Sequence, residues 1–97
     1  MLAIFLLSFT VDYYYFTADY CAACKTQTPI VVRLNEEGYD FKIKKDEFNR
    51  YGITTLPTFV VVVKQNGKPI VTVKMMNRHW SRRELKTLVN TVKILTL

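Results

Sequence analysis

The stretch YFTADYCAACK, residues 15–25, contains both cysteines of the chain and joins a strand pattern to a helix pattern. Aromatic and other β-favouring residues over residues 11–18, without polar alternation, indicate a β-strand covered on both faces. Over residues 21–37 the apolar side chains recur at helical spacing, and Gly38 follows as a suitable C-terminal cap. We therefore predict a strand that leads directly into a helix beginning at Cys21.

The second half of the chain predicts a β-hairpin followed by a helix. Two β-rich runs within residues 58–75 are joined by Asn66 and Gly67, a pair that tolerates the positive φ angles of a type I′ turn. Pro69 has no N–H group to donate to a neighbouring strand, so the second run is expected at the sheet edge. Residues 81–95 then form an amphipathic helix pattern that starts with the capping-box sequence S-x-x-E.

A shorter strand is predicted between these two regions. Residues 39–44 alternate apolar and charged side chains, and residues 46–52 allow at most a short helix. Helices separate the early strands, which favours parallel pairing there, whereas the hairpin strands must be antiparallel. We therefore predict an α/β fold with a compact central mixed sheet of about four strands flanked by helices.

Length and composition predict a single domain, residues 1–97, because a chain of this size supports one core and 49% of its residues are hydrophobic. The formal charge of +6 favours acidic partners, but the basic residues are spread along the chain, so we expect a solvated basic face and no nucleic-acid partner. The apolar run at residues 1–9 lacks the basic flank and cleavage site of a signal peptide and is too short to span a bilayer. We expect it to be part of the fold, without membrane association.

The two cysteines, Cys21 and Cys24, allow three interpretations. A structural zinc site needs about four ligands, and the chain adds one histidine and no further cysteine, so we expect no metal site within one chain, although two copies could share one. A structural disulfide across so short a loop restricts little of the unfolded chain. A redox pair makes use of the spacing, because a helix start stabilises a thiolate at Cys21 that attacks a substrate disulfide, and Cys24 then resolves the mixed disulfide.

Two separated motifs resemble those of the thioredoxin family. In YFTADYCAACK an aromatic residue precedes C-x-x-C and Lys25 follows it, as in the thioredoxin active-site segment, and Pro29 matches the proline that kinks the active-site helix. The segment YGITTLPTFVVV, residues 51–62, resembles the family segment in which a cis-proline, here Pro57, precedes a Thr and a strand. The resemblance covers nearly the whole chain and implies a thioredoxin-like fold, with a size between those of thioredoxin and glutaredoxin.

The resemblance also implies which residues form the site. The two cysteines are the catalytic pair, no cofactor or metal is required, and the loop that contains the cis-proline lies beside them. The backbone of the residue before that proline pairs with the bound substrate chain. The residues expected to line the substrate groove are Tyr20, Thr55, Leu56 and Pro57.

Other positions depart from the family pattern and are candidate modulators. Thioredoxins place a buried Asp six residues before the first cysteine, where it assists proton transfer, but this chain has Tyr15 there. Lys42 resembles the lysine near that Asp, and Lys25 directly follows the motif. His79 precedes the last helix, in a region that the fold brings near the site, where an imidazole can carry protons. Ala-Ala replaces the Gly-Pro of thioredoxins, and the Gly-Gly-x-Asp segment with which glutaredoxins bind glutathione is absent.

These features predict a monomeric thiol-disulfide oxidoreductase that reduces protein disulfides in the cytoplasm, where such bonds are usually transient. Ribonucleotide reductase is a candidate electron acceptor, and a thioredoxin reductase or glutathione is the expected recycling reductant. The alternative is a thioredoxin-fold binding or assembly module that needs no redox turnover, which the missing Asp and the basic charge favour. A biological role that survives the loss of both cysteines would distinguish the module from the reductase.

Overall fold

Four strands, two α-helices and one short 3₁₀-helix follow one another in the computed structural model, which describes residues 8–45, 47–76 and 78–96. In the apolar run at the N-terminus, residues 1–7 lie outside the described residues, so their expected place in the fold stays a prediction. The elements are β1 (Phe9–Phe16), α1 (Cys24–Glu36), β2 (Phe41–Lys44), η1 (Asn49–Tyr51), β3 (Thr58–Gln65), β4 (Lys68–Met75) and α2 (Arg82–Leu95).

The strands form one mixed sheet in the order β2-β1-β3-β4. β1 pairs in parallel with β2 and antiparallel with β3, and β4 pairs antiparallel with β3. Asn66 and Gly67 form the hairpin turn with φ angles of 51° and 81°, and Pro69 lies in the edge strand β4. The predicted α/β fold with a four-stranded mixed sheet is therefore confirmed.

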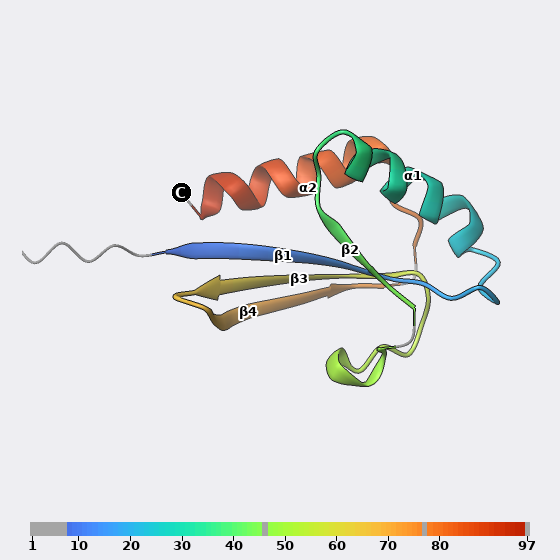
Figure 1. The fold of residues 1–97 in the computed structure, drawn as a ribbon, viewed down its shortest axis with the longest axis horizontal. Helices are drawn as coiled ribbons and strands as arrows, with labels where there is room; N and C mark the ends of the chain where they lie inside the picture. The colour runs from blue at the N-terminus through green and yellow to red at the C-terminus, as the bar shows by residue number, and fades with distance from the viewer. Residues whose placement is uncertain (1–7, 46, 77, 97) are drawn as a thin grey trace, which may run out of the picture.

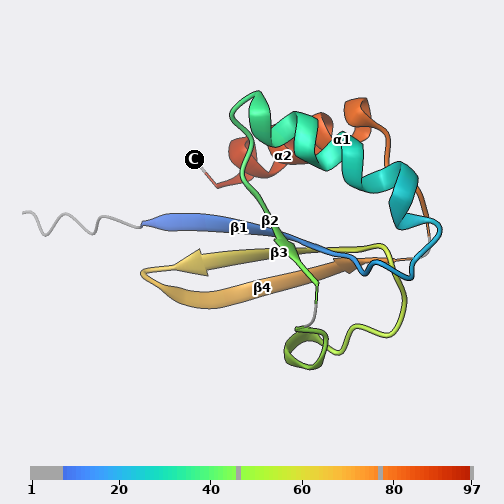
Figure 2. The same ribbon diagram turned by 45° about the vertical axis from the view of Figure 1, so that its right-hand side comes forward.

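The two faces of this sheet are covered unequally. Figures 1 and 2 show α1 and α2 together on one side of the sheet and η1 on the other. Because successive residues of a strand point to opposite faces, the aromatic run of β1 divides between them: Tyr15 packs under the helices, and Phe16 packs near η1. Within the described residues, η1 is the only helix on the second face. The buried core of the helical face is formed by Tyr15, Val31, Leu34, Phe41, Phe59 and Leu85.

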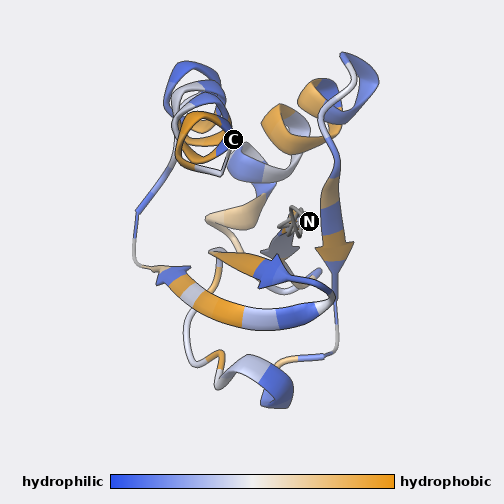
Figure 3. Ribbon diagram, turned by 90° about the vertical axis from the view of Figure 1, so that its left-hand side faces the viewer, coloured by the Kyte–Doolittle hydropathy of each residue, from blue (hydrophilic) through white to orange (hydrophobic). Residues whose placement is uncertain are grey.

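The segment with the cysteines lies at one end of the sheet. The start of α1 follows the carboxyl end of β1, while the start of β1 and the end of α2 lie at the opposite end (Figure 1). Figure 3, viewed from that second end, shows hydrophilic and hydrophobic residues alternating along the sheet beneath the helices.

In the described part of the chain, no helix combines the length and the apolar character needed to cross a bilayer.

A three-residue charge cluster lies on the sheet face opposite the α-helices. Asp12 of β1 pairs with Lys42 of β2 at 2.9 Å and with Lys64 of β3 at 2.8 Å, and its side chain is only 18% exposed. The hydrogen bond from Lys64, and then that from Lys42, hold the pKa of Asp12 below its usual value despite partial burial. Asp12 in turn raises the pKa of both lysines through these hydrogen bonds. The cluster therefore ties three strands together.

Replacing Asp12 with Asn should lower the free energy of unfolding at pH 7 by about 1 kcal/mol, because the partly buried carboxylate pairs with two lysines. A carboxylate whose folded-state pKa is lowered stabilises the fold above its unfolded-state pKa of about 3.9, and this stabilisation is lost as the pH falls through the folded-state pKa. Urea unfolding at pH 7 and pH 2.5 would measure the difference. A difference that is equally large at both pH values would contradict the ionic explanation.

Candidate active site

The two cysteines form a disulfide at the start of α1. Their Cα atoms are 5.3 Å apart, with Cys21 in the turn after β1 and Cys24 as the first residue of α1. The prediction that the helix begins at Cys21 is therefore wrong by one turn. Ala23 precedes the helix with αR dihedral angles, and the Cys24 N–H donates to the Cys21 carbonyl at 3.2 Å. A turn of this kind leaves the same spacing of apolar residues as a helix, so the sequence pattern does not separate the two.

The sulfur of Cys21 takes the place of a helix cap. The Cys24 N–H also donates to Sγ of Cys21 at 3.2 Å, while Ala23 has no side-chain acceptor and the first turn of α1 contains no acidic residue. Backbone N–H groups and the positive end of the helix dipole both favour negative charge at this position. When the disulfide is reduced, the same arrangement stabilises a thiolate at Cys21.

Exposure separates the two sulfur-bearing residues. Cys24 is 2% exposed, whereas Cys21 is half-buried. A protein substrate can therefore approach Cys21, while Cys24 is too buried for a protein substrate to reach directly. This arrangement is the one that a nucleophile and its resolving thiol require.

A hollow of about 320 Å³ lies beside Cys21 and contains part of the predicted substrate groove. Tyr20 stands at its rim with 80% of its surface exposed, and Leu56 forms part of its wall. The Leu56–Pro57 peptide bond is cis, and Pro57 itself is buried. Thr55 does not line the hollow; its hydroxyl is buried and has no hydrogen-bond partner among the described residues. The lining residues are Tyr20, Cys21, Phe48, Ile53, Thr54 and Leu56.

A second hollow, of about 310 Å³, is lined by both cysteines and lies between α1 and the end of β2. Lys25, which the sequence identified as a candidate modulator, lies on its wall, and Lys45 pairs there with Asp19 at 3.1 Å. Tyr15 lies buried beneath it, and its hydroxyl is 2.7 Å from Oγ1 of Thr28. The full lining is Thr17, Ala18, Asp19, Cys21, Cys24, Lys25, Thr28, Ile43 and Lys45.

Thr28 and Lys45 were not identified from the sequence. For Thr28 a signal was present, because it follows Cys24 by four residues and therefore shares its side of the helix. For Lys45 no such local signal exists, since parallel pairing of β1 with β2 brings it to the site. Both residues line the hollow beside the cysteines.

The structure places two other candidate modulators away from the cysteines. Lys42 was expected near the position of Tyr15, but the strand register pairs Tyr15 with Ile43, and Lys42 lies on the opposite face with Asp12. A shift of one residue along a strand reverses the face of a side chain, which explains the error. His79 is exposed and lines neither of the two hollows beside Cys21. In the described ranges, no three His, Cys, Asp or Glu residues gather to bind a metal.

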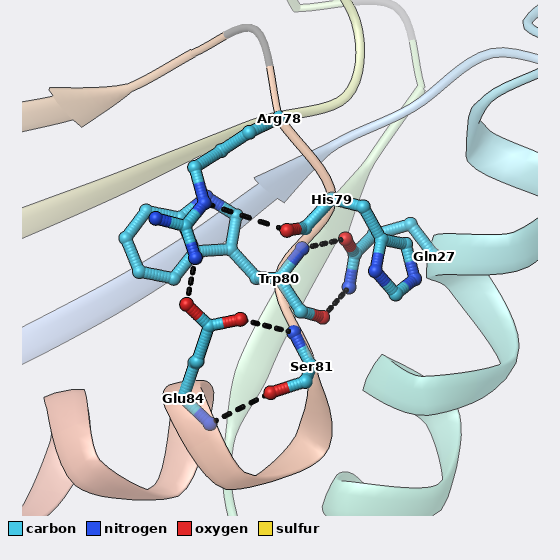
Figure 4. Close-up of polar contacts among 6 residues, drawn as sticks. All are labelled: Gln27, Arg78, His79, Trp80, Ser81 and Glu84. Carbon is cyan, nitrogen blue, oxygen red and sulfur yellow. Dashed lines mark hydrogen bonds and ion pairs between the residues drawn. The ribbon is translucent and has the colours of Figure 1, made fainter.

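A polar cluster joins the active-site helix to the start of α2 (Figure 4). Gln27 of α1 is fully buried; its amide nitrogen donates to the Trp80 carbonyl at 2.9 Å, and its amide oxygen accepts from the Trp80 N–H at 2.7 Å. The Arg78 guanidinium stacks 3.9 Å from the centre of the Trp80 ring and pairs with Glu84. Glu84 also completes the predicted capping box with Ser81. The segment before α2 is therefore fixed to α1 one turn after Cys24.

Two arginines near this cluster pair with carboxylates of the chain. Arg78 pairs with Glu84, and Arg82 pairs with Glu37, so both positive charges are compensated within the chain. Figure 4 shows the Arg78 side chain directed toward Glu84 and the Trp80 ring. The positive charges beside the disulfide are that of Lys25 and that of Lys45, which pairs with Asp19.

Comparison with known proteins is informative at the level of structure. No protein-family model and no curated protein sequence matches the chain. Among solved structures, chloroplastic thioredoxin z is similar with a TM-score of 0.66 and 22% identity, over 88% of this chain and 80% of that one. The malaria parasite thioredoxin-2 has a TM-score of 0.59 and 21% identity, over 86% and 84% of the two chains. The thioredoxin pre-protein of Schistosoma mansoni has a TM-score of 0.56 and 26% identity, over 84% and 77%.

These similarities extend over most of each chain. At the lower identities the likeness concerns the fold, and the cysteine pair adds the chemical feature. The chain therefore has a thioredoxin-like fold, with the Cys21–Cys24 pair at the start of its first helix.

Proposed function

We propose that this chain is a protein-disulfide reductase that works by dithiol exchange. The observation that supports this proposal is the difference in burial at the start of α1, where Cys21 is half-buried and Cys24 is buried. The Cys21 thiolate attacks a substrate disulfide, forms a mixed disulfide and releases one substrate thiol. Cys24 then attacks Sγ of Cys21, its proton passes to the departing substrate sulfur, and the protein is left with the Cys21–Cys24 disulfide. The apolar hollow beside Cys21 suits an unfolded or extended protein segment rather than a small polar thiol.

Insulin reduction by dithiothreitol tests this proposal directly. The protein should shorten the lag before the insulin B chain precipitates, because the activated Cys21 thiolate reacts faster than the free reductant. An equal amount of protein with both thiols alkylated is the matched control. A rate no faster than dithiothreitol alone would reject the reductase and favour the binding or assembly module.

Ribonucleotide reductase is the specific acceptor that we include in this proposal. Lys25 beside the disulfide provides positive charge that suits an acidic partner segment. A ribonucleotide reductase supplied with this protein as its only electron source should form deoxyribonucleotides. Absence of product would exclude this acceptor while leaving the insulin result intact.

Repeated turnover requires a reductant that returns the disulfide to the dithiol. A thioredoxin reductase, or glutathione, would return the Cys21–Cys24 disulfide to the dithiol, and a cytoplasmic location would keep the pair in its reduced form. The reduction potential of the couple, measured against a glutathione buffer, decides between these reductants. A potential close to that of cytosolic glutathione would favour glutathione, and a much lower one would favour a reductase.

A further inference from the structure

Three hydroxyl groups meet beneath the active-site helix. The Tyr15 hydroxyl lies 2.7 Å from Oγ1 of Thr28, and Thr28 lies 3.5 Å from Oγ1 of Thr17. Tyr15 is 0% exposed and Thr17 is 4% exposed. Thr17 and Thr28 line the hollow that also contains Cys24. Two of these hydroxyl-bearing residues therefore line the same hollow as the resolving cysteine.

Helix geometry directs Thr28 toward Cys24. Residues four apart share one side of a helix, with Cβ atoms roughly 5–6 Å apart. Helical side chains also lean toward the N-terminus, so the Thr28 hydroxyl leans toward the turn that contains Cys24. Thr26, by contrast, donates its hydroxyl proton to the Ala23 carbonyl, the usual local bond of a helical Thr. In the described structure the partners of Thr28 are instead the hydroxyls of Tyr15 and Thr17.

The Thr28 hydroxyl can accept one hydrogen bond and donate another. A buried hydroxyl needs a partner, and Thr28 is the partner of the Tyr15 hydroxyl. A phenol is a stronger hydrogen-bond donor than an aliphatic alcohol, so Tyr15 donates and Thr28 accepts. The proton of Thr28 is then free, and in the disulfide form it meets only the distant oxygen of Thr17. The donated bond from Tyr15 also polarises this proton and strengthens the next hydrogen bond that Thr28 makes.

We propose that Thr28, held and polarised by Tyr15, donates a hydrogen bond to the Cys24 thiolate during resolution of the mixed disulfide. This inference rests on the proposed reductase function. Cys24 loses its proton to water in the hollow, and this proton reaches the departing substrate thiolate. The Cys24 thiolate, stabilised by Thr28, forms the bond to Sγ of Cys21 as the bond between Cys21 and the substrate sulfur breaks. Thr28 and Tyr15 keep their protons throughout.

This pair of hydroxyls supports the Cys24 thiolate by hydrogen bonding and does not transfer a proton, unlike the Asp that thioredoxins have at the position of Tyr15. The charged groups that face the hollow are Asp19 from the loop before Cys21, Lys25 from α1 and Lys45 from the end of β2. Asp19 disfavours and the two lysines favour a thiolate, and the Asp19–Lys45 ion pair compensates one charge with another. All these groups are the same in variants of Thr28, so such variants isolate the hydroxyl contribution.

The test uses Cys21→Ser as a background, so that Cys24 is the single thiol. The alkylation rate of Cys24 by iodoacetamide, followed from pH 5 to pH 11, gives the pKa of this thiol. Thr28→Val should raise that pKa by about one unit, which slows alkylation at pH 7 about tenfold. Thr28→Ser should keep the original profile, because it keeps the donor. Tyr15→Phe should shift the profile in the same direction by a smaller amount, since Thr28 loses its polarising partner.

Thr26→Val is the matched control, because it removes a hydroxyl from the same helix that bonds only to the backbone of its own turn. Its profile should equal that of the background. An unchanged pKa in Thr28→Val, or an equal shift in Thr28→Val and Thr28→Ser, would overturn the inference. If Thr28→Val does not fold, Thr28→Ala and Tyr15→Phe give the same comparison. The measurement concerns thiol titration rather than turnover, so its failure is distinguishable from a failure in insulin reduction.

Discussion

Cys21→Ser is expected to abolish insulin reduction, with a loss of about three orders of magnitude or more, because the substrate-accessible nucleophile is removed. Cys24→Ser is expected to abolish turnover as well, but by a different route. Its Cys21 thiolate still attacks the substrate, and nothing then releases the mixed disulfide. The two variants should therefore be equally inactive in the assay and different in what they bind.

Mass spectrometry under non-reducing conditions separates these two cases. Cys24→Ser, mixed with a peptide disulfide, should accumulate one peptide adduct per chain, whereas Cys21→Ser should accumulate little. The reason is the difference in exposure, since Cys24 is 2% exposed and Cys21 is half-buried with an N–H group directed at its sulfur. The double variant controls for non-specific oxidation. Equal adduct formation in the two single variants would contradict the assignment of separate roles.

Gln27→Ala is expected to lower the free energy of unfolding by about 3 kcal/mol. The substitution removes both hydrogen bonds to Trp80, leaves its N–H and carbonyl groups without these partners, and creates a cavity at a fully buried position. For a domain of this size such a loss lowers the Tm by about 12–24 °C. Urea unfolding followed by the fluorescence of Trp80, the single tryptophan of the chain, measures the effect.

Gln65→Ala provides the matched control for this prediction, because Gln65 is the only other glutamine and is half-buried at the end of β3. It should change the free energy of unfolding by less than about 0.5 kcal/mol. Gln27→Leu keeps most of the volume and removes only the hydrogen bonds, so it should fall between the two. Equal stability of Gln27→Ala and the native chain would mean that the Gln27–Trp80 hydrogen bonds contribute nothing to the fold.

Local patterns in the sequence predicted most elements of this fold. Asn66 and Gly67 predicted the hairpin turn, and the S-x-x-E sequence predicted the cap of α2, because each depends on neighbours within a few residues. The start of α1 was misplaced because the turn from Cys21 to Cys24 has helical spacing and a helical residue, Ala23, before the helix begins.

Some residues of the candidate site could also be predicted from local sequence, whereas others depend on contacts between distant segments. The C-x-x-C spacing predicted the Cys21–Cys24 pair, and Tyr20 and Leu56 of the predicted groove line the hollow beside Cys21. The resemblance suggested that Lys42 lies near the position of Tyr15, but the register between β1 and β2 pairs Tyr15 with Ile43 and leaves Lys42 on the opposite face with Asp12. Gln27 was missed because its two partners lie 53 residues away along the chain.

The sequence by itself predicted the Cys21–Cys24 pair and the strand and helix order, and it shows that no Asp stands at the position of Tyr15. Only the tertiary structure decided what replaces that Asp, because the contact between Tyr15 and Thr28 forms when α1 packs on β1. The tertiary structure also decided that Lys45 reaches the cysteines, through the parallel pairing of β1 with β2. Short-range hydrogen bonds and side-chain periodicity can be read along the chain, whereas register and helix packing depend on contacts between distant segments.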